Sequence, residues 1–135
     1  MLFKRAQITA SGQDMPMKSR MGAGFLDNPL IVSIATDANV TLTTAQMSGG
    51  IVTFTGFTAG RNVATPTAAA ILAEALDMDI GDAFVVQFYI LVGFAATWTS
   101  NTGVTLAGRA TTAATSGSNV VVTKTSATTV TWTVL

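Results

Sequence analysis

Apolar and polar residues alternate with a two-residue period along much of the chain, which is typical of strands with one buried face. In residues 129–135, the valines and Trp132 fall on one face and the threonines fall on the other. Further strands are predicted at 30–34, 40–43, 51–55, 82–91, 96–99, 104–108 and 120–124, where β-branched and apolar residues are bounded by turn residues. Residues 120–124 and 129–135 together predict a hairpin.

Two segments depart from this alternation. Residues 83–90 are apolar or aromatic at every position except Gln87, so they predict a central strand buried on both faces. Residues 111–119 contain only Thr, Ala, Ser, Gly and Asn, which predicts a loop. The short strands and frequent turns predict an all-β domain over residues 31–135, either a β-sandwich (jelly-roll-like) or a barrel.

One short α-helix is predicted at about residues 66–76. Thr65 is a suitable N-cap, and Pro66 suits the first helical position, where its missing N–H is not needed. Apolar residues three and four positions apart then form one stripe that would pack on the strands. The stripe consists of Ala68, Ile71, Leu72, Ala75 and Leu76.

Residues 1–30 follow neither the two-residue period of strands nor the 3.6-residue period of helices. We interpret them as an extended N-terminal arm. Residues 1–20 carry a local charge of +3, which the rest of the chain balances with −3. Methionine side chains are flexible and apolar, so they suit an irregular docking surface. A poorly ordered terminus is the alternative interpretation. The partner-binding residues predicted in the arm are Lys4, Arg5, Met15, Met17, Lys18, Arg20 and Met21.

Composition removes several classes of chemistry. The chain has neither Cys nor His, which excludes thiolate nucleophiles, Cys-ligated metals and Ser-His-Asp triads. Charged residues make up 10% of the chain, against about 25% in ordinary soluble domains. We therefore predict no catalytic residue, no metal site and no cofactor, and we expect the protein not to be an enzyme.

The acidic residues near the end of the predicted helix are the remaining candidates for chemistry. Residues 77–82 superficially resemble a calcium loop, but Gly81 is fifth where the EF-hand requires a sixth-position glycine. A helix end followed by a turn explains these residues better. Glycosidases need two carboxylates that flank the scissile bond, and Glu74 and Asp77 could be proposed as such a pair. Nothing in the sequence supplies a pocket for them, so solvated surface acids are the better interpretation.

Threonine and alanine replace charge over much of the chain, which contains 23 Thr and 21 Ala. Threonine suits exposed strand faces, and a face without charge does not repel a copy of itself. We therefore predict a homo-oligomer, with a monomer as the alternative. Zero net charge argues against nucleic acid as a partner. Residues 83–98 form the most apolar stretch and are too short for a transmembrane helix of about 20 residues, so no membrane association is expected.

Residues 40–135 resemble a β-rich domain of structural proteins from tailed bacteriophages. The segments that carry the resemblance follow one another in a shared order and spacing. They are residues 40–47, 49–52, 65–72, 81–84, 102–108 and 125–131.

The resemblance implies a role in the virion as a capsid decoration (cement) protein. Such proteins often form trimers on the shell, so a homotrimer that binds the major capsid protein is expected. The protein would be made in the host cytoplasm and located on the capsid surface. A tail-associated receptor- or glycan-binding module is the alternative, with Trp98, Trp132 and Tyr89 as its possible aromatic platform, although alternation favours a core position for Trp132.

Overall fold

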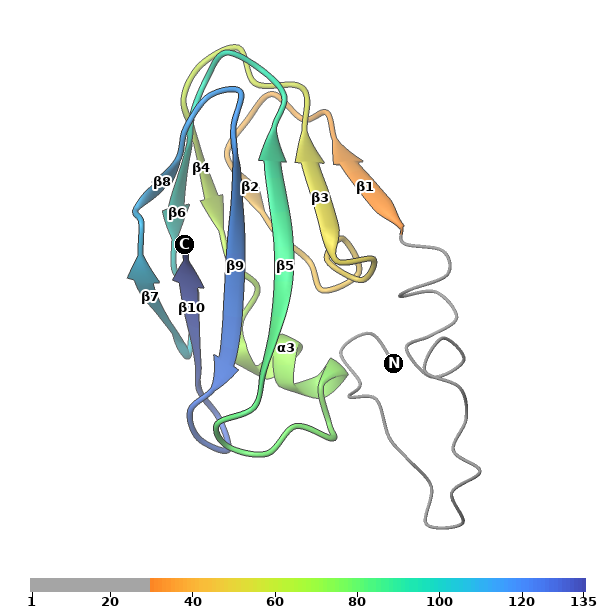
Figure 1. Cartoon of the computed structure of the whole chain (residues 1–135), viewed down its shortest axis with the longest axis vertical. Coiled ribbons are helices and arrows are strands. Elements are labelled where there is room, and N and C mark those ends of the chain that lie inside the picture. Colours follow the sequence, from red (N-terminus) through yellow and green to blue (C-terminus); the bar gives the residue numbers. More distant parts are fainter. Residues whose placement is uncertain (1–29) are drawn as a thin grey trace.

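The computed structural model describes residues 30–135, which form two β-sheets packed face to face and one short helix (Figure 1). The predicted all-β class is therefore confirmed, and the two separate sheets make it a sandwich. The partner-binding residues predicted in the arm lie outside the described residues. The six-stranded sheet has the order β1 (Ile31–Ile34), β3 (Ile51–Phe54), β5 (Ala83–Ile90), β9 (Gly117–Lys124), β10 (Val130–Val134) and β7 (Val104–Gly108). The four-stranded sheet has the order β2 (Val40–Thr41), β4 (Arg61–Ala64), β6 (Ala96–Thr99) and β8 (Thr111–Thr112).

From β1 to β6 the chain alternates between the two sheets. In the six-stranded sheet, β1, β3 and β5 are parallel neighbours, and in the four-stranded sheet β2, β4 and β6 are parallel neighbours. Each successive pair of strands, namely β1 with β2, β3 with β4 and β5 with β6, therefore forms one coil with a strand in each sheet. The coils stack on each other. This parallel winding differs from the antiparallel jelly roll that the sequence suggested. The sequence contains no internal repeat that would have indicated it.

The coils stack closely at their corners, where glycine leaves room for the preceding coil. A Cβ atom placed on Gly56 would lie 1.9 Å from the carbonyl oxygen of Ala35 in the coil before it. The backbone ladder continues around the same corner, because the Thr55 N–H donates to the Ile34 carbonyl at 2.9 Å. Glycine is thus required where two backbones approach this closely.

Aromatic side chains from both sheets fill the core. Trp98 of β6 lies edge-on to Phe88 of β5, with ring centroids 4.9 Å apart, and Trp132 of β10 is 5.7 Å from Trp98. Phe54 of β3 continues the cluster at 6.3 Å from Phe88. Both tryptophans are buried, which confirms the core position predicted for Trp132 and removes both from any surface platform.

The helix α3 spans Ala68–Glu74, which is shorter than predicted and begins two residues later. Thr67 is the N-cap, and its hydroxyl accepts a hydrogen bond from the Ala70 N–H at 3.1 Å. The predicted cap, Thr65, is instead buried, and its hydroxyl accepts from the Asn101 N–H. The helix stops before Leu76, which is 74% exposed and not part of a packed stripe.

Three strand predictions were wrong. Strand β5 is central, but only its inner face is buried, since Val85 and Tyr89 are exposed. The loop predicted at residues 111–119 contains β8 and the start of β9. Strand β4 was not predicted, because Arg61–Ala64 shows no clear alternation and is held by its pairing with β2 and β6.

Candidate association surface

The outer face of the six-stranded sheet carries no charged side chain. Alternation along each strand sends every second residue away from the core, and strand pairing aligns these residues in rows. None of these residues is buried. Across the sheet, the rows are Ser33–Thr53–Tyr89–Gly117, Ile31–Ile51–Gln87–Asn119, Val85–Val121–Thr133–Ala107 and Ala83–Thr123–Thr131–Thr105.

Large apolar side chains stand among the small and hydroxyl-bearing residues of this outer face. Ile31 is 59% exposed and Val85 is 49% exposed, and both are β-branched and stiff. Monomeric proteins seldom leave wide apolar, charge-free areas open to water. The outer face is therefore the part of residues 30–135 best suited to contact another macromolecule.

The Tyr89 ring lies on the outer face over a glycine in the neighbouring strand. Tyr89 pairs with Gly117, and a Cβ atom at Gly117 would lie 2.7 Å from Tyr89 Cδ1. The ring therefore covers the position where a side chain of β9 would stand. It leaves Tyr89 39% exposed, with its apolar body part of the face.

The opposite sheet offers a contrast. The outward residues of the four-stranded sheet are small or polar, and none of them is a large apolar residue; they are Thr41, Asn62, Ala64, Thr97, Thr99 and Thr111. The two outer faces are both uncharged, but only that of the six-stranded sheet combines absence of charge with exposed apolar area.

Charged groups lie at the corners of the sandwich and not on the outer face. Arg61 Nη2 is 2.7 Å from Asp37 Oδ1, and this pair joins the first coil to the second. Hydrogen bonds from the Thr58 hydroxyl and the Thr58 N–H, together with Arg61, lower the pKa of Asp37 from 3.8 to about 2. Asp37 therefore stays ionised and bound at neutral pH.

The acidic segment after α3 forms a turn, as predicted. The Asp79 N–H donates to Asp82 Oδ2 at 2.9 Å, and the Asp82 N–H donates to the Asp79 carbonyl at 3.0 Å. Within residues 30–135, no cluster of three or more His, Cys, Asp or Glu side chains is placed to hold a metal ion. Glu74 is the last residue of α3, and Asp77 follows beyond its C-cap.

Alternation could have indicated the outer face from the sequence, but the apolar character of β5 concealed it. Ala83, Val85, Gln87 and Tyr89 are spaced two residues apart, as outward positions must be. Because Val85 is apolar and Tyr89 is aromatic, the pattern predicted burial on both sides. Only the pairing of β5 with β3 and β9 shows that these residues share a surface with Ile31 and Val121.

Comparisons with protein-family models, with curated protein sequences and with solved structures found no match to this chain. Within residues 30–135, no helix has the length and apolarity needed to cross a bilayer.

Proposed function

We propose that the protein is a non-enzymatic structural component of a tailed bacteriophage, a capsid decoration protein that assembles as a homotrimer on the major capsid protein. The observation that carries this proposal is the uncharged outer face of the six-stranded sheet, with Ile31, Val85 and Val121 exposed or half-buried on it. The resemblance of residues 40–135 to a phage structural domain supports a role in the virion.

The outer face supplies a large part of the area that a stable contact between copies needs. Six strands about 4.8 Å apart and up to eight residues long give a face on the order of 500 Å². A standard interface covers about 800 Å² on each partner. The face therefore supplies more than half of such an interface, with loops at its rim adding to it.

Association of this kind stabilises a shell without chemistry. A protein that binds the assembled capsid better than its separate subunits shifts the equilibrium toward the assembled state. Threonine hydroxyls keep the face wettable before assembly, and the absence of charge avoids desolvation of ions when the face is buried against a neighbouring molecule. The same outer face can thus keep the free protein soluble and pack against a neighbouring molecule after assembly.

The tail-associated glycan-binding alternative has less support. That function calls for exposed aromatic rings, and both tryptophans are in the core. Tyr89 and Phe94 are exposed aromatic residues, but Phe94 lies beyond the end of β5 and pairs with no ring among the described residues.

The test is binding to empty capsids of the phage that encodes the chain, measured by co-sedimentation. The proposal predicts saturable binding of the purified protein, with a fixed ratio to capsid subunits. Val85→Lys should weaken it, and Thr97→Lys, on the outer face of the four-stranded sheet, is the matched control. Absence of binding at saturating protein would overturn the proposal.

A further inference from the structure

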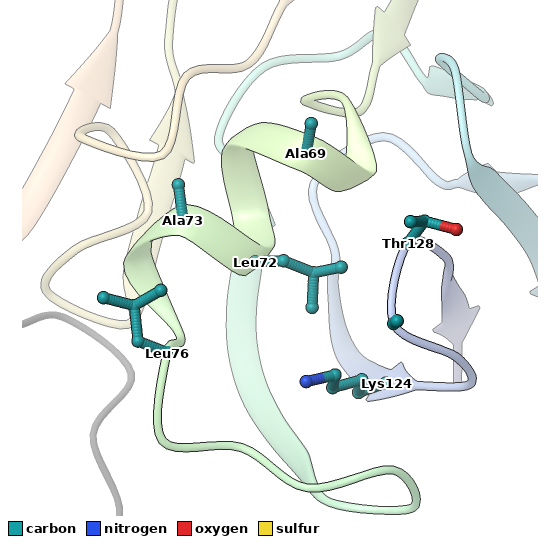
Figure 2. Close-up of a pocket in the computed structure, with 7 residues that line it drawn as sticks. Ala69, Leu72, Ala73, Leu76, Lys124 and Thr128 are labelled. Atoms are coloured by element: carbon teal, nitrogen blue, oxygen red, sulfur yellow. The ribbon is translucent and has the colours of Figure 1, made fainter.

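A groove lies between α3 and the turn that joins β9 to β10 (Figure 2). Its volume is about 370 Å³, and small or apolar side chains form most of its wall. Leu76 stands at one end and is 74% exposed, so a large apolar group there faces open space. The lining residues are Ala69, Leu72, Ala73, Leu76, Lys124, Ala127 and Thr128.

Lys124 contributes its alkyl chain to the groove. Its ammonium donates a hydrogen bond to the Met78 carbonyl oxygen at 2.9 Å, so the charge is held against the backbone after α3. Long lysine side chains commonly cover apolar surface in this way. The groove therefore offers apolar contact along most of its length.

The segment after α3 makes this end of the molecule acidic. Glu74, Asp77, Asp79 and Asp82 lie within nine residues, and the Lys124 ammonium binds the Met78 carbonyl in the same segment. These four acids and one base have a formal charge of −3. Ile80 stands among these acids and is 67% exposed. An occupant that suits this end would combine flexible apolar side chains with positive charge.

The chain itself contains such an occupant. Residues 15–21 read Met-Pro-Met-Lys-Ser-Arg-Met, so three methionines accompany Lys18 and Arg20. Methionine adapts to irregular apolar surfaces, and the two bases complement the acidic segment. The segment is thus matched to the groove in both polarity and charge.

The topology places the groove within reach of this segment. Because β1 and β5 are both parallel to β3, the chain enters β1 at the end of the sheet where α3 leads into β5. The strand register from Ile31 through Gln87 to Ala83 and Thr123 puts residue 30 roughly 20 Å from Lys124. The nine residues from 21 to 30 can span about 30 Å when extended.

We propose that residues 15–21 dock in the groove between α3 and the β9–β10 turn of the same chain. The methionines would contact Leu72, Leu76 and the Lys124 alkyl chain, and Lys18 and Arg20 would lie against the acids of residues 74–82. This docking stands independently of the capsid function proposed above.

The absence of native cysteine allows a direct crosslinking test on the full-length protein. One variant carries Met17→Cys with Leu76→Cys, and the control carries Met17→Cys with Gly93→Cys. Gly93 is exposed, has open space around it and follows the opposite end of β5, away from the groove. A short bismaleimide is added at low micromolar protein, and mass spectrometry counts links within one chain.

The expected result is that the Leu76 pair links within the chain at least about ten-fold faster than the Gly93 pair, because docking raises the effective concentration of the two thiols. Lys18→Glu with Arg20→Glu in the same background should bring the rate toward that of the control, as should 1 M salt. Equal rates for the two pairs, or links formed only between chains, would overturn the proposal.

Discussion

The indole Nε1 of Trp98 donates a hydrogen bond to Oγ1 of Thr112 at 3.0 Å, and the Thr112 hydroxyl donates in turn to Ser118 at 2.8 Å. Trp98 and Thr112 belong to the four-stranded sheet, and Ser118 belongs to the six-stranded sheet. These buried polar groups therefore tie the two layers together. Trp132 Nε1 is also buried but has no hydrogen-bond partner among the described residues.

Thr112→Val should lower the free energy of unfolding by about 1–3 kcal/mol, because it leaves the Trp98 N–H and the Ser118 hydroxyl without this partner in a dry core. The shape of the side chain is nearly unchanged, so the effect reports on hydrogen bonding. Thr111→Val, on the exposed side of the same short strand, should change the free energy of unfolding by less than about 0.5 kcal/mol. Urea denaturation of both variants measures the difference, and equal stabilities would contradict the assigned role of Thr112.

Gly108→Ala should destabilise the protein by at least about 2 kcal/mol. Gly108 ends β7 with a φ of +80°, and a Cβ atom there would lie 2.0 Å from the Val134 carbonyl oxygen of β10. Gly93→Ala is the matched control, since nothing lies within 4 Å of its Cβ position. Thermal unfolding of the two variants should show a large loss for the first and little change for the second; similar melting temperatures would show that β7 tolerates a side chain at its end.

Asp37 should make stability depend on acid pH. Its pKa is about 2 in the folded protein and 3.8 by its ordinary value, so folding favours the ionised form. The contribution of Asp37 to the free energy of unfolding is present above about pH 4. It is lost as the pH falls from about 4 toward 2. Asp37→Asn should therefore be less stable than the wild type at pH 6, and the difference should shrink by pH 2. Unfolding curves at both values check this, and a constant difference would argue against the Asp37 assignment.

Much of the strand content could be predicted from local sequence, because alternation fixes which side chains face inward. Strand β10 is the clearest case, with Val130, Trp132 and Val134 buried as its pattern indicates. The helix start was displaced because Thr65 and Thr67 are both suitable caps. Thr65 is used elsewhere, since its hydroxyl accepts from the Asn101 N–H, and that contact depends on tertiary structure.

The coil arrangement and the outer face could not be predicted, because both depend on contacts between distant residues. The parallel pairing of β4 with β2 and β6 holds a segment with little strand character of its own. The face that joins Ile31 to Val85 and Val121 exists only once three strands are in register. Local patterns give the inward side of each strand but do not place strands beside one another.

We propose that copies of the chain associate as a trimer in which the outer face of the six-stranded sheet of each copy packs against a different surface of its neighbour. Sedimentation equilibrium of the purified protein and two variants measures this association. Val85→Lys places a charge in the centre of that face, and Thr97→Lys places the same charge on the other sheet. At micromolar concentration the wild type and Thr97→Lys should have three times the 13.9 kDa mass of the chain. Val85→Lys should shift toward the monomer, with its dissociation constant raised at least about ten-fold. A monomeric wild type, or a Val85→Lys variant that assembles as well as Thr97→Lys, would contradict the claim.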